Sequence, residues 1–179
     1  MSLQEKVSQL FILGAPYNST SRDFAKFLKE KKPGALILFG RNIETPWQTY
    51  QLNEFAQKVS RESTGLPLLI MVDQEGGAVT RIKTRPNAPS ALALGKTQTP
   101  EVSRKAGFLI GEILALLGFN MNLAPVLDLS HPLAANFIGS RSFGHDPVRV
   151  KYMGHAFAKG LIQRGVIPTA KHFPGHGRI

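Results

Sequence analysis

The chain has 179 residues, of which 42% are apolar and 19% are charged, a balance typical of a folded globular protein rather than a disordered or fibrous one. It contains no cysteine, which excludes disulfides and thiolate metal ligands. No apolar run approaches the roughly 20 residues of a membrane helix. The 22 basic residues outnumber the 12 acidic ones, but they are scattered and have no interleaved aromatic stripe. We therefore expect neither a nucleic-acid nor a membrane partner.

Four helices are predicted along the chain. The first is indicated by apolar residues at helical spacing from Phe24 to Leu28, and it ends by Pro33-Gly34. The other three begin where a side-chain oxygen precedes a proline, a pair that caps a helix and fills its first position. These starts are Thr45-Pro46, Thr99-Pro100 and Asp146-Pro147, and the helices run until Gly65, Gly118 and Gly165.

Short apolar runs between these helices predict strands at residues 35–39, 68–72, 120–123 and 166–170, with 10–13 as a weaker first candidate. Regular alternation of strands and helices predicts βαβ units and a parallel sheet. The segments 73–99 and 124–146 are much longer than the roughly 2–6 residues usual for such connections. They are therefore predicted to be functional loops.

The motif Asp73-Gln74-Glu75-Gly76-Gly77 begins where the predicted strand 68–72 ends, and Arg81 follows it. The loops after parallel strands are where α/β folds place their sites. A carboxylate can accept sugar hydroxyls, Arg81 can donate hydrogen bonds or orient the acid, and the glycines let the backbone approach a ligand. The alternative is a structural Asp73-Arg81 pair at a turn.

The second long loop contains Arg141, in the stretch Ile138-Gly-Ser-Arg-Ser-Phe-Gly144. It is either a fixed donor for a ligand or an ordinary surface arginine. Asp128 and His131 lie earlier in this loop, but one carboxylate and one imidazole do not make a metal site. We therefore predict no metal here.

Lys171 and His172 follow the last predicted strand, in the run Lys171-His-Phe-Pro-Gly-His-Gly177. Adjacent side chains at a strand end can both reach the site edge once the strand gives way to a loop. Together with Gly175 and Gly177 they indicate ligand contact, and His176 is a further candidate. A phosphate-binding loop is disfavoured, because the glycine-lysine pattern of such loops is missing.

Three segments in this order, Asp73-Gln-Glu-Gly-Gly with Arg81, Ile138-Gly-Ser-Arg-Ser-Phe, and Lys171-His-Phe-Pro-Gly-His-Gly, resemble glycoside hydrolase family 3, with similarity from Leu3 to the last residue. The resemblance implies a TIM-type (β/α)8 barrel and a retaining β-N-acetylglucosaminidase that removes terminal N-acetylglucosamine from peptidoglycan fragments. It assigns sugar binding to one set of residues: Asp73, Arg81, Arg141, Lys171 and His172. It implies no cofactor, since the reaction needs carboxylate, imidazole and water.

The family's acid/base histidine and nucleophilic aspartate have no counterpart here, and the resemblance places both beyond Ile179. Asp73 and Glu75 should not be assigned those roles, because one carboxylate cannot supply both functions. We expect 1–179 to be the N-terminal portion of one barrel domain, with about five of eight βα units, and to be inactive alone. Its open edges would need a C-terminal fragment, self-association or domain swapping to cover them.

Two other functions remain open from the residues. One is a family 3 β-glucosidase or a relative that uses phosphate as acceptor, because the sugar-binding residues do not fix the substituent at carbon 2. The other is a non-catalytic sugar-binding or interaction module. The stretch from Met1 to Lys6 lacks the basic start and apolar block of a secretory signal. We therefore expect a cytoplasmic location.

Overall fold

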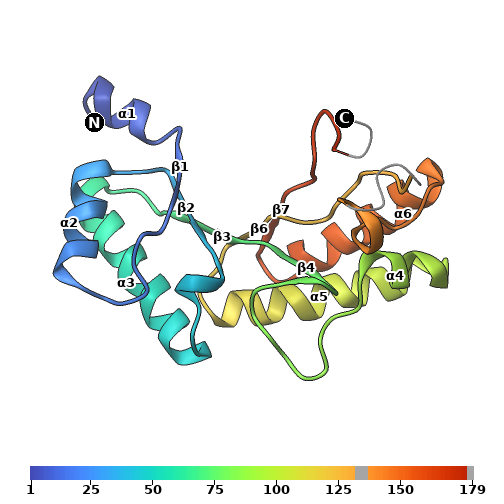
Figure 1. Ribbon diagram of the computed structural model, residues 1–179. Helices are drawn as coiled ribbons and strands as arrows, with labels where there is room; N and C mark the ends of the chain where they lie inside the picture. Colours follow the sequence, from blue (N-terminus) through green and yellow to red (C-terminus); the bar gives the residue numbers. More distant parts are fainter. Residues whose placement is uncertain (132–136, 177–179) are drawn as a thin grey trace. The chain divides into compact units, whose positions relative to one another are not determined.

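The computed structural model describes residues 1–131 and 137–176, and the chain divides into two compact units (Figure 1). The first unit comprises Met1–Val72 and Leu116–Met121, and the second comprises Asp73–Ala115 and Asn122–Ile179. Every candidate site residue from Asp73 to His176 belongs to the second unit.

The first unit is built on three parallel strands, β1 (Ile12–Gly14), β2 (Ala35–Leu38) and β3 (Leu69–Val72). Their register places Leu36 of β2 opposite Ile70 of β3, and both side chains are fully buried. The rings of Phe24 and Phe55 pack in a tilted arrangement, with centroids 6.0 Å apart, so aromatic packing joins two of the helices. The helical elements are α1 (Leu3–Ser8), α2 (Arg22–Lys31), η1 (Gly40–Asn42) and α3 (Pro46–Thr64).

The second unit opens with an antiparallel hairpin of β4 (Gln74–Gly76) and β5 (Val79–Thr80). At its last strand, the Thr169 N–H donates to the Asn122 carbonyl oxygen at 3.0 Å, and Val126 forms a parallel bridge with Lys171. These contacts place the loop that follows residue 122 beside the loop that follows residue 168. The other elements that lie wholly or largely in this unit are α4 (Ala91–Thr97), α5 (Pro100–Leu116), η3 (Gly139–Arg141), α6 (Pro147–Ile162) and β7 (Ile167–Pro168), and β6 (Met121–Asn122) lies at the boundary between the units in the chain.

The predicted α/β class is confirmed. Strands β1, β2, β3, β6 and β7 alternate with helices along the chain, as βα units of a barrel do. The described residues hold five such strands, fewer than the eight that close a barrel. The barrel is therefore incomplete, as predicted.

Two of the three predicted capping oxygens are confirmed. The Thr45 side chain accepts a hydrogen bond from the Gln48 N–H, and Asp146 accepts one from the Val148 N–H. At the third start the helix begins at Pro100 as predicted, but the Thr99 hydroxyl donates backwards to the Thr97 carbonyl oxygen at 3.0 Å. That hydroxyl accepts no hydrogen bond from an N–H group of the described residues, so the capping bond predicted there is not formed.

The first long loop contains structure that the sequence pattern did not indicate. The hairpin β4–β5 and helix α4 both lie within residues 73–99. Gly76 and Gly77 lie against the backbone of the same loop, because a Cβ on Gly76 would come within 2.4 Å of the Pro89 oxygen, and one on Gly77 within 2.6 Å of Ser90 Cβ. These glycines therefore allow close packing within the loop.

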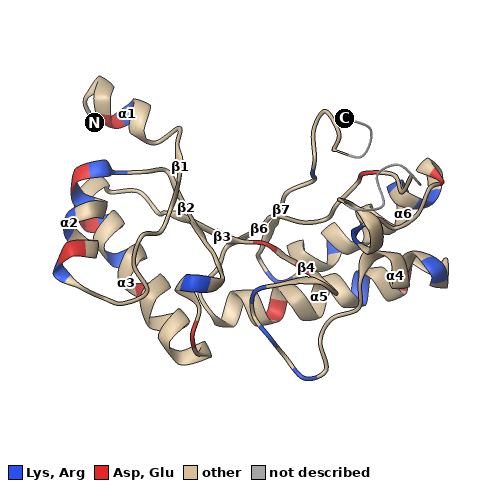
Figure 2. Ribbon diagram, in the orientation of Figure 1, with Lys and Arg blue, Asp and Glu red and all other residues tan. Residues whose placement is uncertain are grey.

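Charge is spread over both units. Figure 2 shows lysine and arginine on several helices and loops rather than on one element, as the scattered sequence positions indicated. In the described part of the chain, no helix combines the length and apolarity needed to cross a membrane.

Candidate functional site

The site begins at the end of β3, where Gln74 fixes the direction of its two acidic neighbours. The Gln74 N–H donates to Asn122 Oδ1 at 3.0 Å, and Asn122 Nδ2 returns a hydrogen bond of 3.0 Å to the Gln74 carbonyl. The Gln74 side chain accepts from the N–H groups of Arg81 and Ile82 and donates to the Ile82 carbonyl. Because Gln74 and Asn122 are buried and their polar groups are paired, the backbone that carries Asp73 and Glu75 is held in one position.

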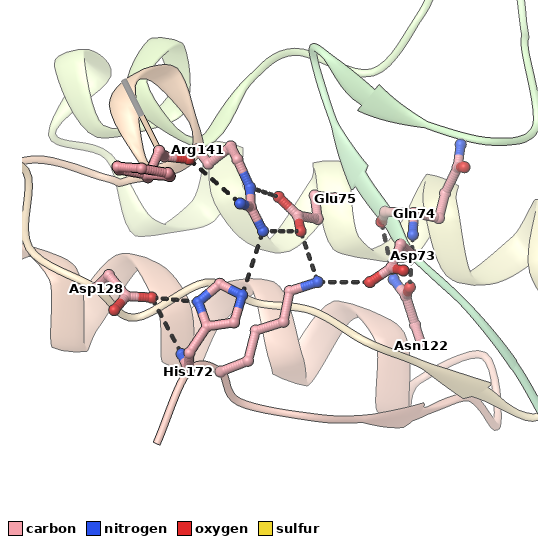
Figure 3. A network of polar contacts seen from close by, with 9 residues as sticks. Asp73, Gln74, Glu75, Asn122, Asp128, Arg141 and His172 are labelled. Carbon is pink, nitrogen blue, oxygen red and sulfur yellow. Dashed lines mark hydrogen bonds and ion pairs between the residues drawn. The ribbon is translucent and has the colours of Figure 1, made fainter. Parts of the chain in front are cut away.

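Lys171 joins these two acids. Its backbone is fixed beside the preceding loop, since the Leu127 N–H donates to the Lys171 carbonyl at 2.7 Å. Its ammonium group lies 2.6 Å from Asp73 Oδ1 and 2.6 Å from Glu75 Oε1 (Figure 3). Lys171 therefore bridges two carboxylates that both follow β3.

Arg141 lies on the other side of Glu75. Its Nε and Nη2 atoms donate to the two oxygens of Glu75 at 2.8 and 2.7 Å, which is the bidentate geometry that guanidinium and carboxylate groups favour (Figure 3). The next residue, Ser142, is fully buried, and its hydroxyl donates to the Asp128 carbonyl at 2.6 Å. The turn that carries Arg141 is therefore anchored in the fold.

His172 completes the network. Its Nδ1 lies 2.6 Å from Asp128 Oδ2, and its Nε2 lies 3.3 Å from Arg141 Nη2 (Figure 3). The His172 ring also packs edge-on to His176, with centroids 5.0 Å apart, and His176 lies 5.9 Å from the ring of Phe137. Polar groups from three loops thus meet at one place, with imidazole and aromatic rings at its side.

The two most buried acids of the network are held in the charged form. Burial alone would raise the pKa of Glu75, but hydrogen bonds from Arg141 and Lys171 outweigh it and hold the pKa below its ordinary value. Burial opposes ionisation of Asp128 in the same way, and the bonds from His172 and the His176 N–H again lower its pKa. The bidentate bond to Glu75 raises the pKa of Arg141.

The structure brings four of the five predicted sugar-binding side chains together: Asp73, Arg141, Lys171 and His172. Arg81 is fixed by its backbone to Gln74, but its half-buried side chain makes no hydrogen bond or ion pair with any described residue. Asp73 pairs with Lys171, so the alternative of a structural Asp73-Arg81 pair is wrong. Arg141 is likewise no ordinary surface arginine.

Of the last motif, His176 lies beside the network and donates its backbone N–H to Asp128 Oδ1 at 2.6 Å. Gly177 lies outside the described residues. No group of three or more histidine, cysteine, aspartate or glutamate residues in residues 1–131 and 137–176 is arranged to hold a metal ion. Asp128 bonds to the His172 ring and to the His176 N–H.

Sequence reasoning missed two central residues. Glu75 binds both cations of the network, and Asp128 holds His172, yet neither was predicted to have these roles. Glu75 is two positions after Asp73, a spacing that directs both side chains to one side of an extended segment. Asp128 lies in the loop that follows β6, six positions after Asn122, so its place in a loop after a strand was the available signal.

Comparison with known proteins identifies the family. The model of the glycosyl hydrolase family 3 N-terminal domain matches residues 2–179. The chain belongs to glycosyl hydrolase family 3. Among curated family members, a beta-hexosaminidase of Pseudomonas aeruginosa PAO1 is 37% identical over 155 residues, which are 85% of this chain and 45% of that protein. One from Photobacterium profundum is 36% identical over 172 residues, 95% of this chain and 49% of that protein.

Solved structures of glycosyl hydrolase family 3 show the same fold. A β-N-acetylglucosaminidase from Paenibacillus sp. FPU-7 matches with a TM-score of 0.90 at 38% identity, covering 99% of this chain and 34% of that one. NagZ from Neisseria gonorrhoeae matches with a TM-score of 0.83 at 29% identity, covering 93% of this chain and 50% of that one. The chain therefore spans about half the length of the curated relatives, and a similar or smaller share of these structures.

Proposed function

We propose that the network around Glu75 is the sugar-binding part of a retaining β-N-acetylglucosaminidase, which removes N-acetylglucosamine from the non-reducing end of peptidoglycan fragments. The observation that carries the proposal is the convergence of Asp73, Arg141, Lys171 and His172 in one network. The similar beta-hexosaminidases and β-N-acetylglucosaminidases support the substrate class. One similar structure is a NagZ in complex with N-trifluoroacetyl-D-glucosamine.

The network has the hydrogen-bonding capacity that a sugar needs. Asp73 uses only Oδ1 in its bond to Lys171, so its second oxygen is available to accept from hydroxyl groups. Two of the three ammonium protons of Lys171 point to Asp73 and Glu75, which leaves one for a ligand. The Arg81 guanidinium adds further donors. A neutral molecule with several adjacent hydroxyl groups matches this mixture of donors and acceptors.

Glu75 is unsuited to either catalytic role of a retaining reaction. A general acid needs a carboxyl group that keeps its proton near neutral pH, whereas the pKa of Glu75 is lowered. A nucleophile needs a free oxygen, and both oxygens of Glu75 are bonded to Arg141 and one also to Lys171. We therefore assign Glu75 and the residues that it holds to binding and distortion of the sugar rather than to bond cleavage.

The test is a titration of the protein with N-acetylglucosamine and with glucose, followed by calorimetry. We expect saturable binding of N-acetylglucosamine, weakened about tenfold or more in D73N and K171M because each removes a charged hydrogen-bonding partner. D23N is the matched control, since Asp23 is an exposed residue of the first unit. Equal binding of both sugars would favour the β-glucosidase alternative, and no binding of either would refute the proposal.

Hydrolysis is tested on the full product of the source gene with aryl glycosides of N-acetylglucosamine and of glucose. Preferential release from the N-acetylglucosaminide is expected, and release from neither would favour a non-catalytic sugar-binding module. We further propose that residues 1–179 form the N-terminal portion of one barrel domain, and that the protein acts in the cytoplasm. Limited proteolysis and cell fractionation test these two points.

A further inference from the structure

Asp128 is the least exposed carboxylate of the network, with a side chain only 2% exposed. It accepts three hydrogen bonds from the last motif. Oδ2 accepts from the His172 N–H at 3.1 Å and lies 2.6 Å from His172 Nδ1, while Oδ1 accepts from the His176 N–H at 2.6 Å. Both oxygens are thus used by one short segment, residues 172–176.

These contacts select one form of the His172 ring. An ionised carboxylate can only accept, so His172 Nδ1 must carry the proton that it shares with Asp128. Arg141 can only donate, so the Nε2 atom that lies 3.3 Å from its Nη2 must be the unprotonated nitrogen. The two neighbours therefore favour the same neutral tautomer, with Nδ1 protonated and Nε2 an acceptor.

Asp128 also fixes the backbone at both ends of residues 172–176. The segment between these two bonds carries Phe173, whose side chain is 98% exposed and gives the segment little packing of its own. The position of the His172 ring therefore depends on Asp128 more than on apolar burial.

We propose that Asp128 is a positioning residue that presents His172 Nε2 as a hydrogen-bond acceptor for a sugar hydroxyl. The inference rests on the proposed function, because the hydroxyl is that of the bound N-acetylglucosamine. A hydroxyl donates one hydrogen bond to Nε2 and can accept another from Arg141, whose contact with Nε2 is long at 3.3 Å. Asp128 itself does not touch the sugar, since its oxygens are occupied by the segment that it holds.

The experiment combines imidazole NMR with sugar binding. Long-range ¹H–¹⁵N spectra of histidine-labelled protein are recorded at about pH 8, above the ordinary histidine pKa, and H172Q assigns the His172 signals. We expect a protonated Nδ1 and an unprotonated Nε2 in the wild type. In D128A we expect loss of this tautomer and about tenfold weaker binding of N-acetylglucosamine.

D128N is the second variant. Asparagine has nearly the same shape as aspartate, so D128N still tests the inference if D128A fails to fold. Its amide oxygen can replace only one of the two carboxylate oxygens, so its sugar affinity should lie between those of the wild type and D128A. H176A is a control for the tautomer alone, because His176 is itself a candidate for ligand contact. It keeps the backbone N–H that binds Asp128, so the His172 tautomer should not change.

A wild-type His172 protonated at Nε2 would overturn the inference. The inference would also be overturned if D128A and D128N both kept the wild-type ¹⁵N shifts of His172 and bound the sugar within about twofold of the wild-type affinity. A twofold change is well below the loss of affinity expected when a charged hydrogen bond is removed. If the wild type binds no sugar but the tautomer is present and depends on Asp128, the positioning of His172 is supported and the proposed function fails.

Discussion

The carboxylate of Glu75 holds the guanidinium of Arg141 by two hydrogen bonds, of 2.8 and 2.7 Å, although the two residues are 66 positions apart in the chain. The same carboxylate lies 2.6 Å from Lys171 Nζ. The Glu75 side chain is only 5% exposed, so its negative charge balances the charges of Arg141 and Lys171 at a buried position. The residues proposed to bind sugar are therefore organised around an acid whose two oxygens are both bonded to cations.

Replacing Glu75 by glutamine should destabilise the second unit strongly. Removing one partner of a buried ion pair leaves the other charges uncompensated, and such changes cost about 3 kcal/mol of unfolding free energy. The measurement is urea denaturation followed by circular dichroism. E112Q is the control, because the Glu112–Arg164 pair has side chains 39% and 35% exposed, and its loss should cost less than about 1 kcal/mol. Equal losses in both variants would contradict the prediction.

Replacing Arg81 by alanine should weaken sugar binding without lowering the stability of the fold. Its side chain makes no hydrogen bond or ion pair with a described residue, so R81A should change the unfolding free energy by no more than about 0.5 kcal/mol. If the guanidinium donates to the sugar, the same variant should bind N-acetylglucosamine about tenfold more weakly. Denaturation and calorimetry on one preparation give both values. Unchanged affinity would remove Arg81 from the proposed binding set.

Stability should fall in acid because of Glu75 and Asp128. Both have a folded-state pKa below the ordinary value, so each contributes stability that is fully present above the unfolded pKa of about 4. That contribution is lost as the pH falls through the lowered folded pKa. Melting temperatures measured from about pH 6 to pH 3 should therefore decline, and less steeply in E75Q and D128N. Parallel curves for the wild type and both variants would argue against this origin.

Helices α5 and α6 should tolerate no side chain at Gly107 or Gly160. A Cβ on Gly107 would lie 2.1 Å from the Phe157 carbonyl oxygen, and one on Gly160 would lie 2.1 Å from that of Arg104. Overpacking of this kind costs about 1–3 kcal/mol, so G107A and G160A should both lower the midpoint of urea denaturation. G40A serves as control, because nothing lies within 4 Å of the Cβ position at Gly40.

The sequence predicted the main helices well, because their signals are local. Proline after a capping residue marked the starts of α3 and α6, and a glycine with φ of 76° ends α3 at Gly65 as expected. The hairpin β4–β5 and helix α4 were missed, since they are short and depend on tertiary contacts such as that of Gly76 with Pro89. Strand β7 is shorter than the apolar run that predicted it.

The candidate site was predicted by residue type and position, but its connections were not. Motif position placed Asp73, Lys171 and His172 at strand ends, and the structure joins them through Glu75 and Asp128. Periodicity carries no information on which acid pairs with which cation, because that depends on distances across the fold. Arg81 was expected either to donate to a ligand or to orient Asp73, and Lys171 rather than Arg81 makes the contact with that acid.

The bond between Asp73 and Lys171 joins residues 98 positions apart, and this separation has a consequence for biosynthesis. At roughly 5–20 residues per second, a ribosome exposes Asp73 and Glu75 roughly 5–20 s before Lys171. An unpaired carboxylate is costly to bury, so Glu75 must remain hydrated until its first partner, Arg141, has been synthesised. The nascent chain therefore cannot complete the ion-pair network of Asp73 and Glu75 before both Arg141 and Lys171 have been synthesised.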